Sequence, residues 1–234
     1  MARLLLFDID GTLVLTGGAG VRAMTRAFED LFGIKDAFSG IHMPGRTDAW
    51  ILADAAAAHG IPPTELDRFV DVYVDHLARE IGVPALRKGV MPGVRPLLDA
   101  LAARDDVYLA LLTGNYERAA RVKLEYFDLW RYFECGAFGD AAPDRNGLLS
   151  RAVERVRMCG GPAVDAADVV VIGDTPLDVA CAAAGGARSI AVATGGYDVA
   201  ALRAAGADVV FDDLRDTAAV LAVLRVTDAD PHER

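Results

Sequence analysis

The chain has 234 residues, of which 53% are hydrophobic and 25% are charged. This balance excludes a largely disordered chain and, at this length, predicts one or two compact globular units. The 34 acidic residues outnumber the 24 lysines and arginines, which gives a formal net charge of −10, and an acidic surface without a basic cluster makes nucleic acid and anionic membranes poor partners.

Five short apolar runs have the character of buried β-strands, because they are rich in Val, Ile and Leu and are flanked by Gly, Asp or Thr. They are residues 3–8, 107–113, 169–174, 189–193 and 208–211. Segments with helical patterning lie between these runs, at residues 96–104, 116–126, 148–158, 176–184 and 199–204. Strands that alternate with helices indicate right-handed crossovers and a parallel sheet covered on both faces. We therefore predict a doubly wound, Rossmann-like α/β fold.

One long stretch breaks this alternation. It shows no convincing buried strand, only helical patterns at residues 21–32, 47–59 and 64–81. Small residues flank the stretch on both sides, and we expect these flanks to act as hinges. The pattern predicts an all-helical cap domain of residues 16–90, inserted into a core domain that comprises residues 1–15 and 91–234.

The chain carries three cysteines, Cys135, Cys159 and Cys181. Their number is odd and their spacing matches no metal-binding pattern, so we expect buried thiols rather than structural disulfides. No apolar stretch is long enough to span a membrane, and residues 4–7 are too short for the apolar core of a secretory signal. We therefore expect a cytoplasmic protein.

Ligands of open parallel sheets bind beyond the carboxyl ends of the strands, so the residues that follow the predicted strands are the candidates for chemistry. Those residues are acidic, small or polar: Asp8, Asp10, Gly11 and Thr12 after the first strand, Thr113, Gly114 and Asn115 after the second, and Asp174 and Asp178 after the third. Because the strands are parallel, these side chains should converge on one edge of the sheet.

Carboxylates that crowd together repel each other and raise each other's pKa unless a cation compensates them. A hard divalent ion with oxygen ligands, above all Mg²⁺, meets that need, whereas the lack of a Cys/His cluster disfavours zinc. The turns at Gly11 and Gly114 offer backbone N–H groups, and Thr113 offers a hydroxyl, as donors for phosphate oxygens. A metal, anion donors and a nucleophilic carboxylate together predict phosphoryl transfer.

These residues resemble three motifs of the haloacid dehalogenase superfamily. Asp8-x-Asp10-Gly-Thr12 looks like the first motif, Thr113-Gly-Asn115 like the second, and Gly173-Asp174-x-x-x-Asp178 like the fourth. The predicted helical insert after the first motif resembles the helical cap of that superfamily. The order and spacing of the motifs cover essentially the whole chain, which makes the resemblance specific.

The resemblance implies a role for each acidic residue. Asp8 is the expected nucleophile, which forms an aspartyl-phosphate, and Asp10 is the expected acid and base for the leaving oxygen and the attacking water. Mg²⁺ is expected on the Asp8 carboxylate, the Asp10 backbone carbonyl and Asp174, with Asp178 holding a metal-bound water or orienting its neighbours. Dehalogenases and phosphonate-cleaving members of the superfamily lack the acid at the position of Asp10, so its presence indicates a phosphate ester.

The phosphoryl group is expected to bind Gly11, Thr113, Gly114, Asn115 and a cation from the third motif. That motif usually contains a Lys, but no lysine lies between Lys123 and Asp174. The best substitute is Arg145, directly before a predicted helix, because a guanidinium can hold two phosphoryl oxygens. In the insert, Arg46 resembles part of a cap loop that faces the active site, where it would contact a substrate anion; a solvated surface arginine is the equal alternative.

Each motif also has a purely structural interpretation. Asp8 and Asp10 can end a strand and begin a turn, since Asp-Gly is a common turn signal. The residues from Thr113 to Asn115 can cap the following helix, and Asp178 can complement the dipole of a helix N-terminus. The functional interpretation is preferred because all three motifs occur in order at predicted strand ends.

The sequence therefore predicts a Mg²⁺-dependent phosphomonoesterase that acts on a small phosphorylated metabolite and resembles the phosphoglycolate-phosphatase-like members of the superfamily. Two alternatives stay open at this point. A phosphomutase of the β-phosphoglucomutase type would share Asp8, Asp10 and the cap but pass the phosphoryl group to a sugar. A non-catalytic binding protein on the same fold is supported only by the missing lysine of the third motif.

Overall fold

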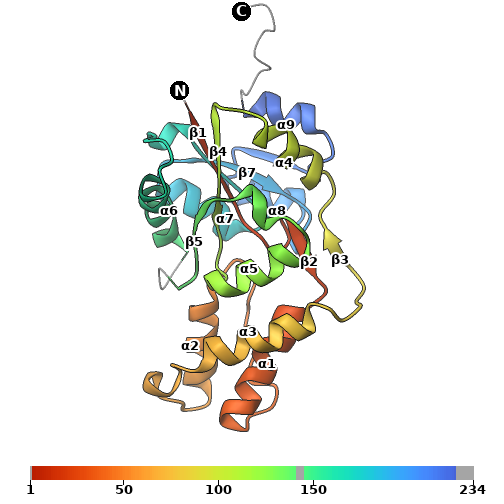
Figure 1. The fold of residues 1–234 in the computed structure, drawn as a ribbon, viewed down its shortest axis with the longest axis vertical. Coiled ribbons are helices and arrows are strands. Elements are labelled where there is room, and N and C mark those ends of the chain that lie inside the picture. The colour runs from red at the N-terminus through yellow and green to blue at the C-terminus, as the bar shows by residue number, and fades with distance from the viewer. Residues whose placement is uncertain (1, 141–144, 225–234) are drawn as a thin grey trace, which may run out of the picture.

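The computed structural model describes residues 2–140 and 145–224. Its main feature is a parallel sheet with the strand order β5-β4-β1-β6-β7-β8 (Figure 1). The strands are β1 (Arg3–Phe7), β4 (Val107–Leu112), β5 (Cys135–Ala137), β6 (Val169–Gly173), β7 (Arg188–Val192) and β8 (Val209–Phe211). Helices connect them: α4 (Val94–Ala102), α5 (Glu117–Tyr126), α6 (Asn146–Met158), α7 (Pro176–Ala184) and α8 (Val199–Ala204), with α9 (Thr217–Val223) after β8. The predicted doubly wound α/β fold is confirmed.

The central strand β1 shows why both faces of the sheet are covered. Its apolar residues alternate between two cores, because successive side chains of a strand point to opposite faces. Leu5 and Phe7 pack in the core that includes residues of α4 and α5, whereas Leu4 and Leu6 pack against α6 and α7. The side chains of all four are fully buried.

The register of the strands brings the predicted motifs to one edge. Phe7, the last residue of β1, is paired with Leu111 of β4 and Ile172 of β6. The Asp8 backbone N–H then donates to the Ile172 carbonyl at 2.9 Å, which extends the ladder by one step. The chain segments that follow the three central strands therefore leave the sheet side by side.

A helical insert lies beyond this carboxyl edge and contains α1 (Ala19–Phe32), α2 (Asp48–Ala58) and α3 (Phe69–Glu80) (Figure 1). Its interior is aromatic, with the Phe28 ring centroid 5.6 Å from Phe38 and 6.3 Å from Phe69. The predicted helical cap is thus present. The predicted helix at residues 64–81 is instead a short 3₁₀ turn, η1 (Pro63–Glu65), followed by α3.

Two short strands join the insert to the core. β2 (Val14–Thr16) and β3 (Lys88–Val90) pair as an antiparallel ribbon, with Leu15 opposite Gly89. These two strands and the edge strand β5 were not predicted. β3 and β5 each contain a glycine and lack an apolar run such as the Val-Val-Phe of β8, which is equally short but was predicted. The predicted domain limits at 15/16 and 90/91 fall within and at the end of this ribbon, and the division into domains stays a prediction.

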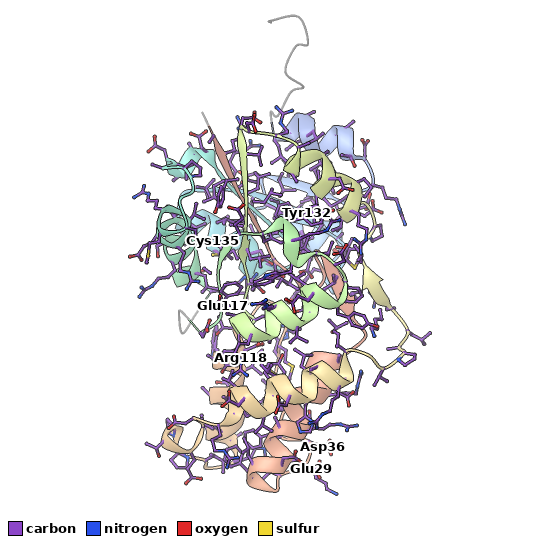
Figure 2. All side chains as sticks on the ribbon, in the orientation of Figure 1. Glu29, Asp36, Glu117, Arg118, Tyr132 and Cys135 are labelled. Atoms are coloured by element: carbon purple, nitrogen blue, oxygen red, sulfur yellow. A yellow bond between two sulfur atoms is a disulfide. The ribbon has the colours of Figure 1, made fainter. Side chains whose placement is uncertain are left out.

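The expectation of three buried thiols is wrong for two of the cysteines. Cys135 of β5 and Cys159, which ends α6, form a disulfide with a Cα–Cα distance of 6.4 Å, and Cys135 lies on the edge strand (Figure 2). Counting cysteines cannot show this pairing, because α6 returns antiparallel to β5 and brings together residues 24 positions apart. Cys181 is buried, and its thiol donates to the Arg145 carbonyl at 3.1 Å.

None of the helices among residues 2–140 and 145–224 combines the length and the apolar character that crossing a membrane demands.

Candidate active site

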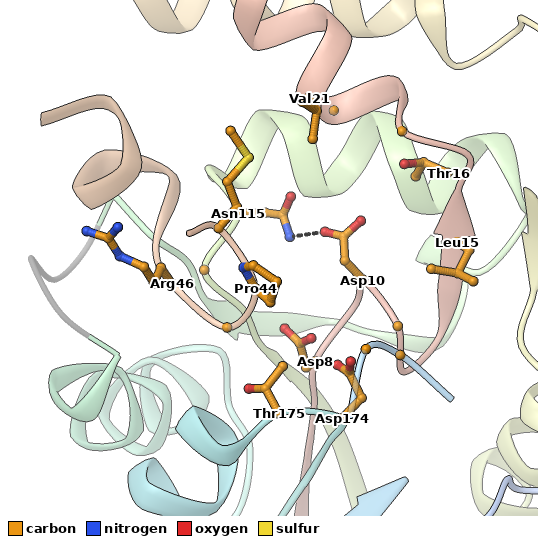
Figure 3. A pocket seen from close by; sticks show the side chains of 18 of the residues that line it. Asp8, Asp10, Leu15, Thr16, Val21, Pro44, Arg46, Asn115, Asp174 and Thr175 are labelled. Carbon is orange, nitrogen blue, oxygen red and sulfur yellow. Dashed lines mark hydrogen bonds between the residues drawn. The ribbon is translucent and has the colours of Figure 1, made fainter. Parts of the chain in front are cut away.

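The predicted site residues meet at the carboxyl edge of the sheet. Asp8 and Asp10 follow β1, Asp174 follows β6, and Asp8 and Asp174 lie next to each other below Asp10 (Figure 3). Asp178 sits in the first turn of α7, where Thr175 caps the helix by accepting from the Asp178 N–H. The loop after β4 supplies Asn115, and Arg145 is the residue directly before α6.

Three of these carboxylates form a tight buried group. Oxygen atoms of Asp8, Asp174 and Asp178 lie within 4.8 Å of one another, and none of the three residues is more than 5% exposed. Burial raises the pKa of Asp8 to about 6, against the lowering effect of Arg145. Burial raises the pKa of Asp174 well above its ordinary value, and the charges of Asp8 and Asp178 raise it further. Such a cluster is suited to a divalent metal ion, which would relieve the repulsion.

Arg145 is a fixed cation inside this acidic group. Its Nη2 lies 2.8 Å from Asp8 Oδ1 and also donates to Asp178, and its Nη1 donates to the Gly45 carbonyl at 3.0 Å. Burial alone would lower the pKa of the guanidinium, but Asp178 and Asp8 raise it above its ordinary value. The side chain is 3% exposed, and its Nε has no hydrogen-bond partner within the part of the chain that the structure describes. The group is therefore held in place with donor capacity left for a ligand.

The predicted metal ligand Asp178 has both carboxylate oxygens engaged by protein groups. Oδ1 accepts from Arg145, and Oδ2 accepts from the Thr175 backbone N–H at 3.0 Å and from the Thr175 hydroxyl at 2.7 Å. Among the residues that the structure describes, Asp174 in contrast accepts a single weak bond, from the Thr12 hydroxyl at 3.3 Å. The geometry therefore favours Asp174 over Asp178 as a direct ligand.

Asp10 stands apart from the buried carboxylates, with a side chain that is 41% exposed. Its Oδ2 accepts from Asn115 Nδ2 at 2.8 Å and pairs with the Lys123 ammonium at 2.6 Å (Figure 3). Asn115 also donates to the Thr113 hydroxyl at 2.8 Å, so the second motif is linked through one amide to the first. Thr113 itself is fully buried.

Gly11 and Gly114 are glycines for steric reasons. Gly11 has φ of +89°, which L side chains rarely adopt, and a Cβ there would collide with the Asp174 carboxylate. A Cβ on Gly114 would collide with the Arg46 carbonyl of the insert. Both positions therefore require glycine. The Gly11 N–H donates to the Val14 carbonyl at 2.9 Å, and the phosphate-binding role of the two turns stays a prediction.

A cavity of about 490 Å³ opens over these residues, between the core and the insert. The core contributes polar walls, including Asp8, Asp10, Asn115, Lys123, Arg145 and Asp174. The insert contributes a mostly apolar roof that includes Val21, Met43, Pro44, Ile51 and Tyr73. A small ester can thus place its phosphoryl group on the core side and its alcohol part against the insert.

Arg46 lines the cavity, but its guanidinium is engaged within the insert. It donates to the His42 carbonyl at 3.0 Å and to Asp54 at 2.6 Å, and it stacks 4.0 Å above the Trp50 ring. In Figure 3 the side chain extends away from Asp8 and Asp10. A contact between Arg46 and a substrate anion therefore requires the exchange of these bonds and stays a prediction.

Two buried polar residues at the site were missed from the sequence, Lys123 and Asp48. Lys123 is 5% exposed on its side chain, although α5 is a polar helix overall. Its position between Ala119, Ala120 and Leu124 on the buried face is a signal that could have found it, because an ammonium on an apolar face needs a partner. Asp48 begins α2, and its carboxylate accepts from the Tyr116 N–H at 3.0 Å.

Asp48 ties the insert to the second motif, since its own N–H donates to the Gly114 carbonyl at 2.7 Å. Burial raises the pKa of Asp48 to about 7, although Lys123 and the Tyr116 N–H lower it. Between pH 3.8 and about 7 the unfolded chain ionises this group while the folded protein keeps it neutral. The free energy of unfolding therefore falls as the pH rises through that window. Above it, the contribution of Asp48 no longer changes with pH.

Asp48→Asn removes this penalty and keeps an acceptor for the Tyr116 N–H. We compare the free energy of unfolding of the variant with that of the wild type at each pH. The difference in favour of the variant is expected to be larger at pH 8 than at pH 5, by roughly 2 kcal/mol. Urea unfolding at the two pH values measures the difference. Asp75→Asn, on the exposed face of α3, should give no such change, and an equal gain at both pH values for Asp48→Asn would contradict the raised pKa.

The fold and the site together define a class: enzymes with a doubly wound sheet whose acidic pocket, at the carboxyl edge and under a helical insert, acts on phosphate esters. Residues 2–186 match the family model described as haloacid dehalogenase-like hydrolase. The chain belongs to this family. It is a hydrolase, and more narrowly a phosphatase.

Similar proteins agree with this assignment. The chain is 31% identical to a phosphoglycolate phosphatase from Rhodospirillum rubrum, over 91% of this chain and 88% of that protein. It is 30% identical to the probable phosphatase IndB from Dickeya dadantii, over 99% and 98% of the two chains. A solved hydrolase from Pseudomonas syringae shares the fold, with a TM-score of 0.70 and 21% identity over 96% of this chain and 99% of that one.

Proposed function

We propose that this phosphatase depends on Mg²⁺ and hydrolyses the monoester of a small phosphorylated metabolite, with Asp8 as the nucleophile. The setting of Asp8 supports this proposal most. Its carboxylate is buried on the cavity wall, 2.8 Å from the Arg145 guanidinium and close to Asp174. A carboxylate held in one orientation beside a fixed cation is placed to attack a phosphorus atom whose oxygens that cation binds.

The reaction would proceed in two halves. In the first, a carboxylate oxygen of Asp8 forms a bond to phosphorus, the bond between phosphorus and the ester oxygen breaks, and Asp10 gives its proton to that leaving oxygen. In the second, Asp10 takes a proton from a water molecule, the water oxygen attacks phosphorus, and the bond from phosphorus to the Asp8 oxygen breaks. Inorganic phosphate leaves, and both carboxyl groups return to their starting states.

The phosphoryl oxygens need donors throughout. We assign these to Arg145, the Thr113 hydroxyl and the backbone N–H group of Gly114. The predicted contributions of Gly11 and Asn115 require an exchange of bonds, because the Gly11 N–H donates to the Val14 carbonyl and the Asn115 side-chain amide donates to Asp10 and Thr113. Arg145 would replace the lysine of the third motif, and its contact with Asp8 supports this. The planar fork of a guanidinium can bind two phosphoryl oxygens at once.

The oxygen donors fit a hard divalent ion. The carboxylates of Asp8 and Asp174 and the backbone carbonyl of Asp10 would hold Mg²⁺, which would offset negative charge on the phosphoryl oxygens. Because both oxygens of Asp178 are engaged, we assign it to the orientation of Arg145. This assignment chooses the second of the two roles expected for Asp178.

A glycine close to Asp174 offers a test of this metal site. A Cβ on Gly195 would collide with the Asp174 carboxylate, whereas a Cβ on Gly196 would meet no atom within 4 Å. We expect Gly195→Ala to displace the carboxylate and raise the Mg²⁺ concentration for half-maximal activity by about 10-fold or more. Gly196→Ala is the matched control, and its magnesium titration should follow the wild type. Equal titration curves for both variants would remove Asp174 from the metal site.

The site residues specify the phosphoryl group of the substrate more closely than its alcohol part. A relative from Rhodospirillum rubrum is named phosphoglycolate phosphatase, so 2-phosphoglycolate is the first ester to test. Small sugar phosphates and nucleoside monophosphates belong to the same panel, because the cavity of about 490 Å³ admits ligands of that size.

The test of the proposed function is phosphate release from this panel and from p-nitrophenyl phosphate, with Mg²⁺ and after its removal with EDTA. We expect turnover that disappears with EDTA and returns when Mg²⁺ is added. Full activity in EDTA would refute the metal dependence. Interconversion of sugar-phosphate isomers without net phosphate release would favour the mutase alternative. The cytoplasmic location also stays a prediction, which fractionation of the source cells would test.

A further inference from the structure

A buried lysine at the site has no place in the motifs described above. Lys123 lies on α5, and its side chain is 5% exposed. Its ammonium is 2.6 Å from Asp10 Oδ2 and also donates to Asn115 Oδ1. Burying an ammonium costs several kcal/mol unless it is paired well, so a lysine here needs a reason beyond packing.

We propose that Lys123 is a positioning residue of the reaction, which holds the Asp10 carboxylate so that one chosen oxygen faces the ester. The proposal rests on the proposed function, in which Asp10 transfers the protons. Lys123 would act through Asp10 and would not touch the substrate.

The distribution of hydrogen bonds on Asp10 carries the inference. Both donors converge on Oδ2, with Lys123 Nζ at 2.6 Å and Asn115 Nδ2 at 2.8 Å. Oδ1 accepts no hydrogen bond from residues 2–140 and 145–224. The carboxylate is thus anchored by one oxygen and presents the other, and the residue lines the cavity. Proton transfer needs such an oxygen within hydrogen-bond reach of the ester oxygen.

Packing against neighbouring side chains does not fix the orientation of the Asp10 carboxylate, because this side chain is 41% exposed. An exposed carboxylate rotates among several rotamers unless polar contacts restrain it. Lys123 is itself well restrained. It lies on α5, eight residues after Asn115 in the preceding loop, and the two side chains are hydrogen-bonded to each other.

The insert closes over the ammonium from the other side. A Cβ built on Gly20 of α1 would lie 3.5 Å from Lys123 Nζ and 3.8 Å from the Tyr73 hydroxyl of α3. Asp48 on α2 also lies within electrostatic reach of Lys123, whose charge lowers the pKa of the Asp48 carboxyl against the effect of burial. The Lys123 ammonium is therefore shielded from water where the insert meets the core, although the Asp10 side chain is 41% exposed, and burial of the ammonium strengthens its contact with Asp10.

The test distinguishes two effects of a Lys123 substitution, which are misplacement of the Asp10 carboxyl group and a general loss of structure. An ester with a poor leaving group depends on the proton from Asp10, whereas one with a good leaving group depends on it much less. Release of the phenol is therefore measured in single turnovers, with enzyme in excess, for phenyl phosphate and for p-nitrophenyl phosphate. Single turnovers report the first half-reaction alone.

We expect Lys123→Met to lower the rate of phenol release from phenyl phosphate about 100-fold, and the rate with p-nitrophenyl phosphate less than about 10-fold. Loss of a correctly placed general acid lowers rates by about 10²–10⁴-fold. Lys123→Arg, which retains a cationic donor, should recover part of the loss with the poor leaving group. Lys35→Met is the control, because Lys35 is an exposed residue paired with Glu29 on the surface, and it should match the wild type with both esters.

A second experiment measures the effect of Lys123→Met in a protein that lacks the Asp10 carboxylate. In an Asp10→Asn protein, Lys123→Met should have no further effect on the rate with phenyl phosphate, because the lysine acts through the carboxylate. Equal slowing of both esters, or a further loss in the Asp10→Asn background, would overturn the proposal. Should Lys123→Met fail to fold, Lys123→Gln takes its place in both experiments. Wild-type protein that hydrolyses neither ester would instead refute the proposed function.

Discussion

Replacement of Asp8 by Asn is expected to lower phosphate release from p-nitrophenyl phosphate by about 10⁴-fold or more, the scale of loss when a covalent nucleophile is removed. The amide has the shape of the carboxyl group but lacks the negative oxygen that forms the bond to phosphorus. Asp8 also belongs to the cluster that would hold Mg²⁺, so the substitution weakens both contributions. Phosphate release with saturating Mg²⁺ measures the effect.

A matched control is available on the opposite edge of the sheet. Asp105 is exposed in the turn between α4 and β4, and Asp105→Asn should retain wild-type activity. Equal melting temperatures for the two variants and the wild type would show that neither change unfolds the protein. An Asp8→Asn protein that still turned over the ester at a substantial fraction of the wild-type rate would refute the nucleophile assignment.

Replacement of Arg145 by Ala should cost both activity and stability. The guanidinium is the buried cation that contacts Asp8 and Asp178, and loss of one fixed donor to a transition-state anion commonly costs 10²–10³-fold in rate. The change also leaves two buried carboxylates without their partner, which destabilises a fold by about 3 kcal/mol. Steady-state kinetics with Mg²⁺ and thermal unfolding without it report the two effects separately.

The conservative and the control variants sharpen this result. Arg145→Lys retains the charge that the third motif usually supplies, and it should recover part of the activity but not the two-oxygen contact. Arg151→Ala removes an exposed arginine of the same helix, and it should change neither rate nor stability. If Arg145→Ala kept wild-type kinetics, the phosphoryl-binding cation of this site would have to be sought elsewhere, with Lys123 as the next candidate.

The sheet was predictable because its information is local. β1 is a run of apolar residues that ends at Asp8, and β6 is one that ends at Asp174. Short runs buried on both faces indicate parallel strands, and the rule that ligands bind beyond their carboxyl ends does not depend on side-chain detail. The strand β5 escaped prediction for the converse reason, because its sequence Cys-Gly-Ala is not distinguished from a loop, unlike the equally short Val-Val-Phe of β8.

The candidate site shows the same division. The sequence alone predicted that Asp8, Asp10 and Asp174 lie at one edge of the sheet, because each follows a strand and the carboxyl ends of parallel strands lie at the same edge. Arg145 was proposed as the substitute for the lysine that the resemblance leads one to expect before the fourth motif, and the structure shows how it contacts Asp8. The engagement of Arg46 by Asp54 could not be predicted, because it depends on how α2 and the preceding loop pack.

By itself, then, the sequence determined the sheet, the helical insert and the convergence of the acidic motifs, all of which follow from apolar periodicity and chain direction. Only the tertiary structure decided that Cys135 pairs with Cys159, that Asp178 accepts a hydrogen bond from Arg145, and that Lys123 lies against Asp10. These facts are contacts between side chains far apart along the chain or on different elements. Their geometry is set by packing, and no local pattern of residues encodes it.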